Sequence, residues 1–71
     1  MSETEILSFY LKEKRKELKL SQFDLASGSG LSTEIISLYE RQKGDPKLSS
    51  LQKLACYLDT SVSDILKIPE E

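Results

Sequence analysis

The sequence predicts an all-α fold, a compact five-helix bundle in one domain. Its apolar residues recur at helical spacing, and short stretches of Ser, Gly and Pro separate the helical segments. Several segments open with a serine followed three residues later by Glu, Asp or Gln, which is the spacing of a helix N-terminal capping box. With 71 residues, of which 38% are hydrophobic, the chain can build one core, expected over about residues 5–67.

The first helix is expected over residues 3–18. Ser2 and Glu5 at its start have the spacing of a capping box. One face of the helix carries the apolar residues that a bundle would bury. Lys14 or Arg15 lies on the same face. The apolar residues of this face are Leu7, Leu11 and Leu18.

The second helix is expected to begin at Ser21, which stands three residues before the acidic Asp24. Leu25 and Ala26 follow as its buried side. Ala26 is small enough to let two helix backbones approach each other within a tight turn. The turn itself is expected at Gly28–Leu31, because glycine adopts positive φ readily and the leucine can return to the core.

The third helix is capped by Ser32 and buries Ile36 and Tyr39. Its other side forms an exposed strip, called the reading strip below. The members of this strip are Thr33, Glu34, Ser37, Leu38 and Arg41. Two short helices joined by a tight turn, here over about residues 21–41, make a helix-turn-helix, a motif that places its second helix in the major groove of DNA.

The last two helices follow a loop at Gln42–Pro46. Ser49 with Gln52 predicts the start of the fourth helix, and Ser61 with Asp64 predicts that of a short fifth helix. The apolar residues expected to close the core are Leu51, Leu54, Ala55 and Leu58 in the fourth helix and Val62, Ile65 and Leu66 in the fifth. Cys56 lies beside this buried face, and we expect it to be a small packing residue.

The composition argues against catalysis. The chain has no histidine and no tryptophan, and its single cysteine has no imidazole to activate it and no second cysteine for a disulfide or a zinc cluster. We expect no enzymatic activity, no cofactor, no metal ion and no small-molecule ligand. The sequence has neither a signal peptide nor a run of ~18 apolar residues, which predicts a cytoplasmic protein without a membrane partner. The initiator methionine favours a complete small chain.

Residues 11–66 resemble the helix-turn-helix domain of the Cro and lambda-repressor type, also called the XRE family. The matching segments are LKEKRKELKLSQFDLA, GLSTEIISLYER and GDPKLSSLQKLACYLDTSVSDIL. The resemblance implies a lambda-repressor-like fold and a sequence-specific DNA-binding transcriptional regulator, in particular a small repressor or controller. The alternative is a protein-binding module of the same fold, with Ile35 and Leu38 turned toward a partner protein.

The resemblance also implies contacts with DNA phosphates. Gln22, at the first position of the second helix, would bond a phosphate and brace the reading helix, and a solvated polar residue is the alternative. Arg15 would pair with Glu40 and reach a phosphate, or form a purely structural salt bridge with it. The N-terminal ends of the second and third helices would add to the attraction. The other candidates for phosphate contact are Ser21, Lys43 and Lys47, the lysines being solvated surface charges in the alternative.

The reading strip lacks the Gln or Arg that relatives often carry at the positions of Thr33, Glu34 and Leu38. Thr33 can bond a base edge or touch a thymine methyl group, Glu34 can accept a hydrogen bond from cytosine N4, and Leu38 offers apolar contact to thymine. Ser37 can donate or accept, and Arg41 could reach a guanine or a phosphate. An unusual base preference is therefore expected.

The net charge of −2 is opposite to that of a general nucleic-acid binder. The charges are unevenly distributed, since basic residues crowd the second half of the first helix and acidic residues load the termini. The basic set is Lys12, Lys14, Arg15, Lys16 and Lys19, and the acidic set is Glu3, Glu5, Glu70 and Glu71. We expect weak non-specific affinity and a steep salt dependence.

A domain of this size would bury little surface on DNA, so a homodimer on a palindromic site in double-stranded DNA is expected. Two apolar ends are candidates for the dimer surface. They are Ile6, Leu7, Phe9 and Tyr10 in the first helix and Ile65, Leu66 and Ile68 near the C-terminus. The alternative is that the two ends pack on each other within one chain.

Overall fold

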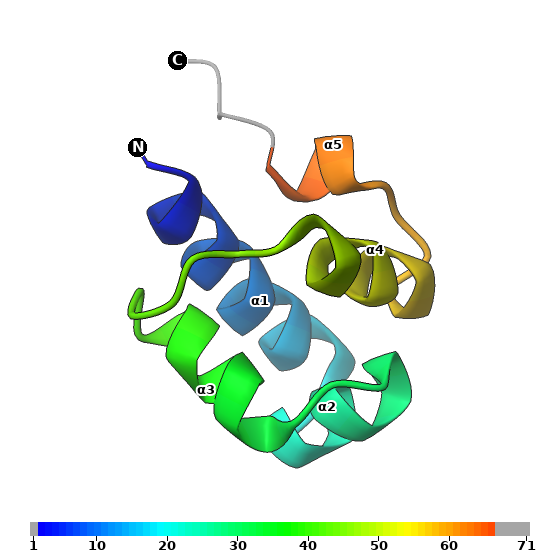
Figure 1. Ribbon diagram of the computed structural model, residues 1–71. Helices are drawn as coiled ribbons and strands as arrows, with labels where there is room; N and C mark the ends of the chain where they lie inside the picture. The colour runs from blue at the N-terminus through cyan, green and yellow to red at the C-terminus, as the bar shows by residue number, and fades with distance from the viewer. Residues whose placement is uncertain (1, 67–71) are drawn as a thin grey trace.

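Five helices make up the computed structural model, which describes residues 2–66. They are α1 (Glu3–Leu18), α2 (Gln22–Ser29), α3 (Thr33–Glu40), α4 (Leu48–Tyr57) and α5 (Val62–Ile65). The long α1 packs against α3 and α5, α2 packs against α3 and α4, and α4 packs against α5 (Figure 1). No strand occurs within residues 2–66. The all-α prediction is confirmed.

Serine caps start four of the five helices. The hydroxyl groups of Ser2, Ser21, Ser32 and Ser61 each accept a hydrogen bond from the backbone N–H three residues on. At α1 and α2 the box is reciprocal, because the carboxylates of Glu5 and Asp24 accept from the backbone N–H of their capping serines. Hydrogen bonds from the backbone and hydroxyl of those serines lower the pKa of both carboxyl groups.

The fourth helix starts differently from the prediction, and the predicted cap at Ser49 is wrong. Helix α4 begins at Leu48, and Lys47 occupies the capping position without a side-chain hydrogen bond. Ser49 is already helical, so its hydroxyl lies too far along the helix to cap it. Packing sets this start, because Ser50 and Leu51 in the first turn are already buried.

The turn between α2 and α3 is shorter than predicted. Gly28 and Ser29 are the last residues of α2, and only Gly30, at φ 78°, has the left-handed conformation that ends the helix. A β-carbon on Gly28 would collide with the ring of Tyr57 in α4, so this glycine makes room for a side chain. Ser29 is buried and donates to the carbonyl of Leu25 at 2.7 Å.

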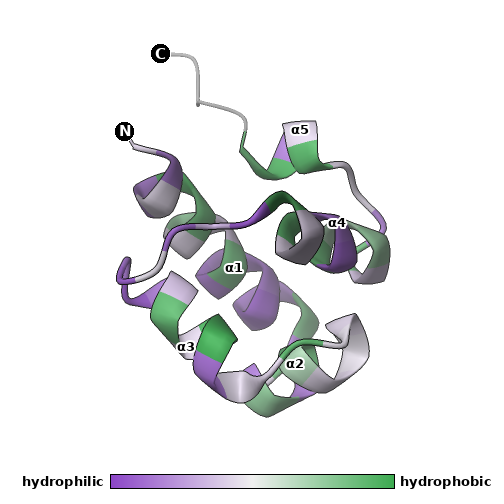
Figure 2. Ribbon diagram, viewed as in Figure 1, coloured by the Kyte–Doolittle hydropathy of each residue, from purple (hydrophilic) through white to green (hydrophobic). Residues whose placement is uncertain are grey.

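The core lies where α1, α2, α3, α4 and α5 meet, and the hydropathy colouring shows apolar residues on the inward sides of the helices (Figure 2). Its buried members are Leu7, Leu11, Leu25, Ala26, Ile36, Tyr39, Leu51, Leu54, Ala55 and Ile65. Ala26, at the α2–α3 crossing, is 2% exposed, as its predicted packing role requires. Leu18 is 49% exposed, against prediction, because the contact of the last turn of α1 with α3 is made by Arg15 through Glu40.

The two apolar ends of the chain pack on each other, as the alternative to a dimer surface predicts. Ile6, Leu7 and Ile65 are buried, and α1 contacts α5 directly. Phe9 remains 58% exposed, and Ile68 lies outside the described residues. Cys56 is exposed and the prediction of a packing residue is wrong, because the neighbouring Ala55 takes the buried position of that helical turn.

Candidate nucleic-acid interface

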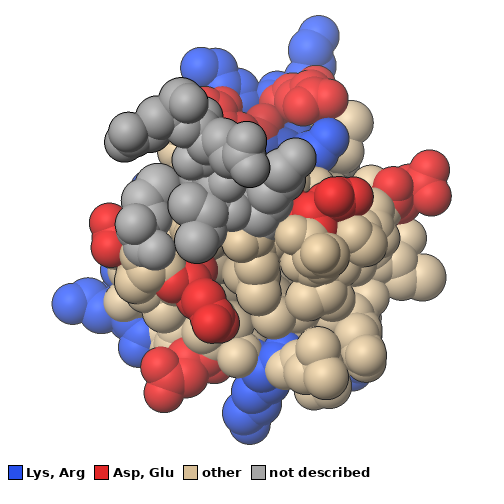
Figure 3. Space-filling view, turned by 90° about the horizontal axis from the view of Figure 1, so that it is seen from above, with Lys and Arg blue, Asp and Glu red and all other residues tan. Residues whose placement is uncertain are grey.

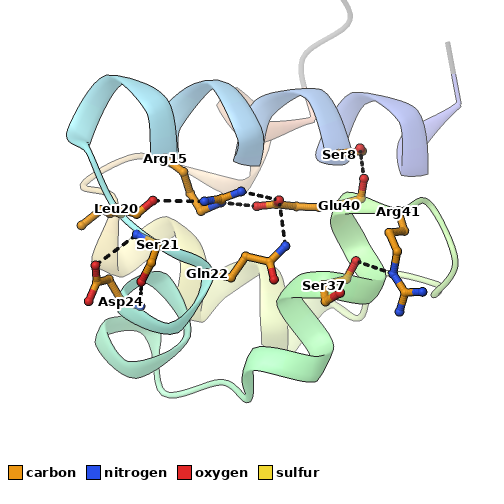
Figure 4. Close-up of polar contacts among 9 residues, drawn as sticks. All are labelled: Ser8, Arg15, Leu20, Ser21, Gln22, Asp24, Ser37, Glu40 and Arg41. Atoms are coloured by element: carbon orange, nitrogen blue, oxygen red, sulfur yellow. Dashed lines mark hydrogen bonds and ion pairs between the residues drawn. The ribbon is translucent and has the colours of Figure 1, made fainter.

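Three helices meet at the carboxylate of Glu40, the last residue of α3. Arg15 of α1 donates from Nε to Glu40 Oε2 at 2.6 Å and from Nη2 to Glu40 Oε1 at 2.8 Å. Gln22, the first residue of α2, donates from Nε2 to Glu40 Oε1 at 3.2 Å. Figure 4 shows the side chains of Arg15 and Gln22 converging on the carboxylate of Glu40. The network fixes the end of α3 relative to the start of α2 and the last turn of α1.

Burial strengthens the ion pair in this network. The side chain of Glu40 is 5% exposed and that of Arg15 is 24% exposed. Hydrogen bonding to Glu40 raises the pKa of Arg15, which stays charged at every pH the fold survives. Arg15 also donates from Nη1 to the carbonyl of Leu20 at 3.1 Å. Its remaining N–H groups have no hydrogen bond to residues 2–66. They can therefore still donate to the oxygens of a DNA phosphate.

Gln22 is half-buried, and its amide is oriented by Glu40. One N–H of the amide is used in that bond, which leaves the other N–H as a donor. The side chain lies at the N-terminal end of α2, where Ser21 and Asp24 fill the cap. Gln22 therefore braces α2 against α3.

The C-terminal end of α3 is fully hydrogen-bonded. Its last four carbonyl groups accept from Arg41 N, Lys43 N, Gln42 N and the hydroxyl of Ser8. Ser8, in α1, is 1% exposed and reaches the carbonyl of Glu40 at 2.7 Å. Ser8 was not predicted as a site residue, although a serine directly after Leu7 on the buried side of a helix indicates a buried hydroxyl group. Ser8 of α1 and the backbone of the loop after α3 thus hold the end of α3 in place.

The reading strip of α3 and the start of α2 line one shallow, open hollow. Its lining consists of Gln22, Thr33, Glu34, Ser37, Leu38 and Arg41. All five predicted base-contact residues therefore share a surface with the predicted phosphate-contact residue Gln22. Arg41 is folded back along its own helix, with Nε 3.4 Å from the carbonyl of Ser37 (Figure 4). A duplex that entered the hollow would meet a threonine, a glutamate, a serine and a leucine on one side of a helix.

The predicted lysines do not line this hollow. Lys43 and Lys47 are exposed, and Lys47 instead borders a second open groove, between α3 and α4, together with Asp45 and Lys53. Lys53 was not singled out in the sequence. It lies on the α4 side of the groove, in the helix that begins at Leu48. The groove adjoins the hollow, because Leu38 lines both.

Charges of both signs lie on the face drawn in Figure 3, which is seen from above the view of Figure 1. Lys and Arg side chains stand there among Asp and Glu side chains. On α1, Lys14 pairs with Glu17 at 3.6 Å, whereas Lys12 and Lys16 border a third hollow beside Phe9 and Gln42. Within residues 2–66, no group of three His, Cys, Asp or Glu side chains could hold a metal ion. None of the helices described is long and apolar enough to cross a bilayer.

Two solved structures similar to this chain are a transcription factor and a gene regulator, and the similar curated sequences are antitoxins. A hypothetical transcription factor NHTF from Neisseria has a TM-score of 0.88 and 26% sequence identity, covering 96% of this chain and 78% of that protein. The clp gene regulator ClgR from Corynebacterium glutamicum has a TM-score of 0.80 and 26% identity, covering 93% of this chain and 70% of that protein. Antitoxin HigA1 from Mycobacterium tuberculosis is 38% identical over 55 residues, which are 78% of this chain and 37% of HigA1. The chain thus spans just over a third of the length of the curated relatives it matches.

The family comparison covers the elements that build this site. The model of the helix-turn-helix family matches residues 11–65, from the middle of α1 to the end of α5. The match contains Arg15, Gln22 and Glu40 as well as the whole reading strip. With that match over most of the chain, the protein belongs to the helix-turn-helix family, of the Cro and lambda-repressor type that its sequence resembles.

Proposed function

We propose that this protein is a sequence-specific transcriptional regulator, a repressor that binds a palindromic operator as a homodimer and inserts α3 into the major groove. One observation carries the proposal: the exposed residues of α3 and the amide of Gln22 line the same hollow. The likeness to a transcription factor and to a gene regulator along almost the whole chain supports a DNA-binding regulator.

The phosphate contacts in this proposal come from the braced side chains. The free N–H groups of Gln22 and Arg15 would bind phosphates beside the reading helix, in positions that Glu40 fixes before DNA arrives. Such preorganisation avoids the entropy cost of ordering long side chains on binding. Lys43 and Lys47, in the loop after α3 and at the cap of α4, would extend the contacts along the backbone.

The base contacts come from the reading strip. Thr33 and Glu34, in the first turn of α3, are exposed, and the N-terminal residues of a recognition helix are those that reach base edges. Ser37 and Leu38 lie one turn further on. Because Glu34 accepts hydrogen bonds and Leu38 forms only apolar contacts, this strip should prefer bases that relatives with glutamine or arginine do not select.

The test is selection from a random duplex library, with the enriched sites titrated at two salt concentrations. An enriched palindrome with half-sites about one helical turn apart supports a dimeric regulator. Gln22→Ala should weaken binding to all sequences, and Thr33→Ala should change the preferred sequence. A folded chain that enriches no duplex at either salt concentration would contradict the proposal and favour a protein-binding module, with Ile35 and Leu38 facing the partner.

A further inference from the structure

We propose that Glu34 and Leu38 together select one cytosine in each half-site and bind it more tightly when its C5 carbon carries a methyl group. This inference rests on the proposed function, since it concerns the base that the reading strip meets in the major groove. It makes the protein sensitive to the methylation of its own operator.

The two side chains converge on one site. Residues at i and i+4 of a helix are neighbours on its surface, and a leucine side chain in a helix leans back toward the preceding turn, here toward Glu34. Both residues line the same hollow, and Leu38 is 37% exposed. Figure 2 shows hydrophilic and hydrophobic residues side by side along α3. A carboxylate and an isobutyl group can therefore reach adjacent atoms of a single base.

The backbone of Leu38 is held by the loop that follows α3, because its carbonyl accepts from Lys43 N at 2.9 Å. The residue is 37% exposed and lines both the hollow and the groove beside it. Part of the leucine side chain is therefore accessible to a base from a helix position that is already fixed.

The Glu34 carboxylate is free to accept from a base. It is exposed, and among residues 2–66 it forms neither a salt bridge nor a side-chain hydrogen bond. In the major groove a carboxylate is stable only opposite a donor, because an acceptor on the base would repel it. This requirement rejects guanine, whose major-groove edge carries two acceptors, O6 and N7.

The other three bases differ in which group lies next to the donor or the methyl group on the major-groove edge. Adenine offers its N6 donor next to the N7 acceptor, and thymine offers its methyl group next to the O4 acceptor. Cytosine offers its N4 donor next to the apolar C5 position, which matches the pairing of Glu34 with Leu38. A methyl group on C5 enlarges the apolar contact and leaves the N4 donor in place. The expected order of affinity at this position is 5-methylcytosine, then cytosine, then thymine.

The experiment uses duplexes enriched by the full chain from a random library. Each cytosine of a half-site is replaced in turn by 5-methylcytosine and by thymine, and Kd is measured by fluorescence anisotropy. One methylated cytosine in each half-site buries two methyl groups per dimer and should tighten binding about fifteenfold, which is about fourfold for each methyl group. Thymine at the same position should weaken binding by at least about fivefold, since it loses the donor.

Two exposed leucines provide the matched variants. Leu38→Ala should weaken binding to the unmodified duplex, and the ratio of its Kd values for unmodified and methylated duplexes should fall to about one because the apolar contact is gone. Leu18→Ala, on α1 and 49% exposed, should keep the ratio of the parent chain. Glu34→Gln should lose the penalty for thymine. Three outcomes would overturn the inference and leave the proposed function intact. The enriched half-site could contain no cytosine, methylation could leave Kd unchanged, or the effect of methylation could persist in Leu38→Ala. If no duplex is enriched, the proposed function fails and the inference fails with it.

Discussion

At the scale of single residues, the hydrogen bonds of Glu40 join α3 to both α1 and α2. Its carboxylate accepts from Arg15 and Gln22, and its backbone carbonyl accepts from Ser8. A buried carboxylate is stable when its oxygens are satisfied by charged and neutral donors, as here. The position of α3, and so the orientation of the reading strip, depends on this residue.

Replacing Glu40 with glutamine should destabilise the fold. The change leaves the guanidinium of Arg15, which is 24% exposed, without its counter-charge, and removing one partner of such a pair costs about 2 to 3 kcal/mol. Urea unfolding followed by circular dichroism measures the loss. Glu17→Gln is the control, because the surface pair of Glu17 with Lys14 is worth less than about 1 kcal/mol. Equal losses in the two variants would show that the Glu40 network contributes nothing beyond a surface contact.

The role of Arg15 and Glu40 as partners could be predicted from the family resemblance, and the structure joins them by two hydrogen bonds. Ser8 could not be predicted with the same ease, because its function depends on the carbonyl of a residue 32 positions later. A serine within an apolar face has many possible acceptors, and the sequence does not say which one lies opposite. Contacts between distant segments are the part of the site that needs the structure.

At the scale of elements, four of the five helix starts carry a serine signal, and the predicted range of residues 3–18 for the first helix is confirmed, whereas the predicted start of α4 is wrong. A serine cap acts within one turn, so Ser2, Ser21, Ser32 and Ser61 mark their helices in the sequence itself. Left-handed residues follow four of the helices, and one of them is a glycine. Lys19 and Gly30 are the C-caps of α1 and α2, and Gln42 and Asp59 lie one residue beyond the C-caps of α3 and α4. At Lys19, Gln42 and Asp59 the backbone N–H of the following residue bonds a carbonyl of the last helical turn, a local arrangement that does not require glycine and so leaves no residue signature.

Lys19→Gly should stabilise the protein. Lys19 ends α1 at φ 58°, where a side chain is strained and glycine is not, and relief of that strain should raise the free energy of unfolding by about 0.5 to 1 kcal/mol. Thermal or urea unfolding measures the change. Lys19→Ala is the matched variant, because it removes the same charge and keeps the β-carbon. Similar stabilities for the two variants would mean that the left-handed residue carries no strain.

Acid should weaken the start of α2. The pKa of Asp24 lies below its ordinary value of 3.8, because the backbone and hydroxyl of Ser21 hydrogen-bond its carboxylate. A carboxyl group whose pKa is lowered on folding stabilises the protein above its unfolded pKa and loses this effect as the pH falls through the folded value. The stability advantage of the parent chain over Asp24→Asn should therefore be present at neutral pH and disappear in acid. A difference in unfolding free energy that is independent of pH would rule out this linkage.

At the scale of the whole molecule, the charge distribution favours specific over general binding. A net charge of −2 gives little attraction to DNA at long range. Affinity then depends on the short-range fit of α3 and its flanking donors. A single copy of a domain this small presents one reading helix, which is why a symmetric pair on a palindrome remains the working proposal.

The spacing of the half-sites tests the homodimer. Inserting about five base pairs, half a helical turn, between the half-sites of an enriched palindrome rotates one of them to the opposite face of the duplex. A rigid dimer should then lose most of its affinity, as measured by gel shift, whereas an insertion of about ten base pairs should be less harmful. Affinity that is indifferent to spacing would indicate independent monomers.

The central claim, that the exposed side of α3 contacts DNA, is tested most directly by nuclear magnetic resonance. Backbone amide signals of the isotope-labelled chain are followed as an enriched duplex is added. The account predicts the largest shifts at Gln22, across Thr33–Arg41 and at Lys43, with small shifts in α5 and the first turn of α1. Shifts concentrated on α5 or on the N-terminal half of α1, with α3 unaffected, would contradict it.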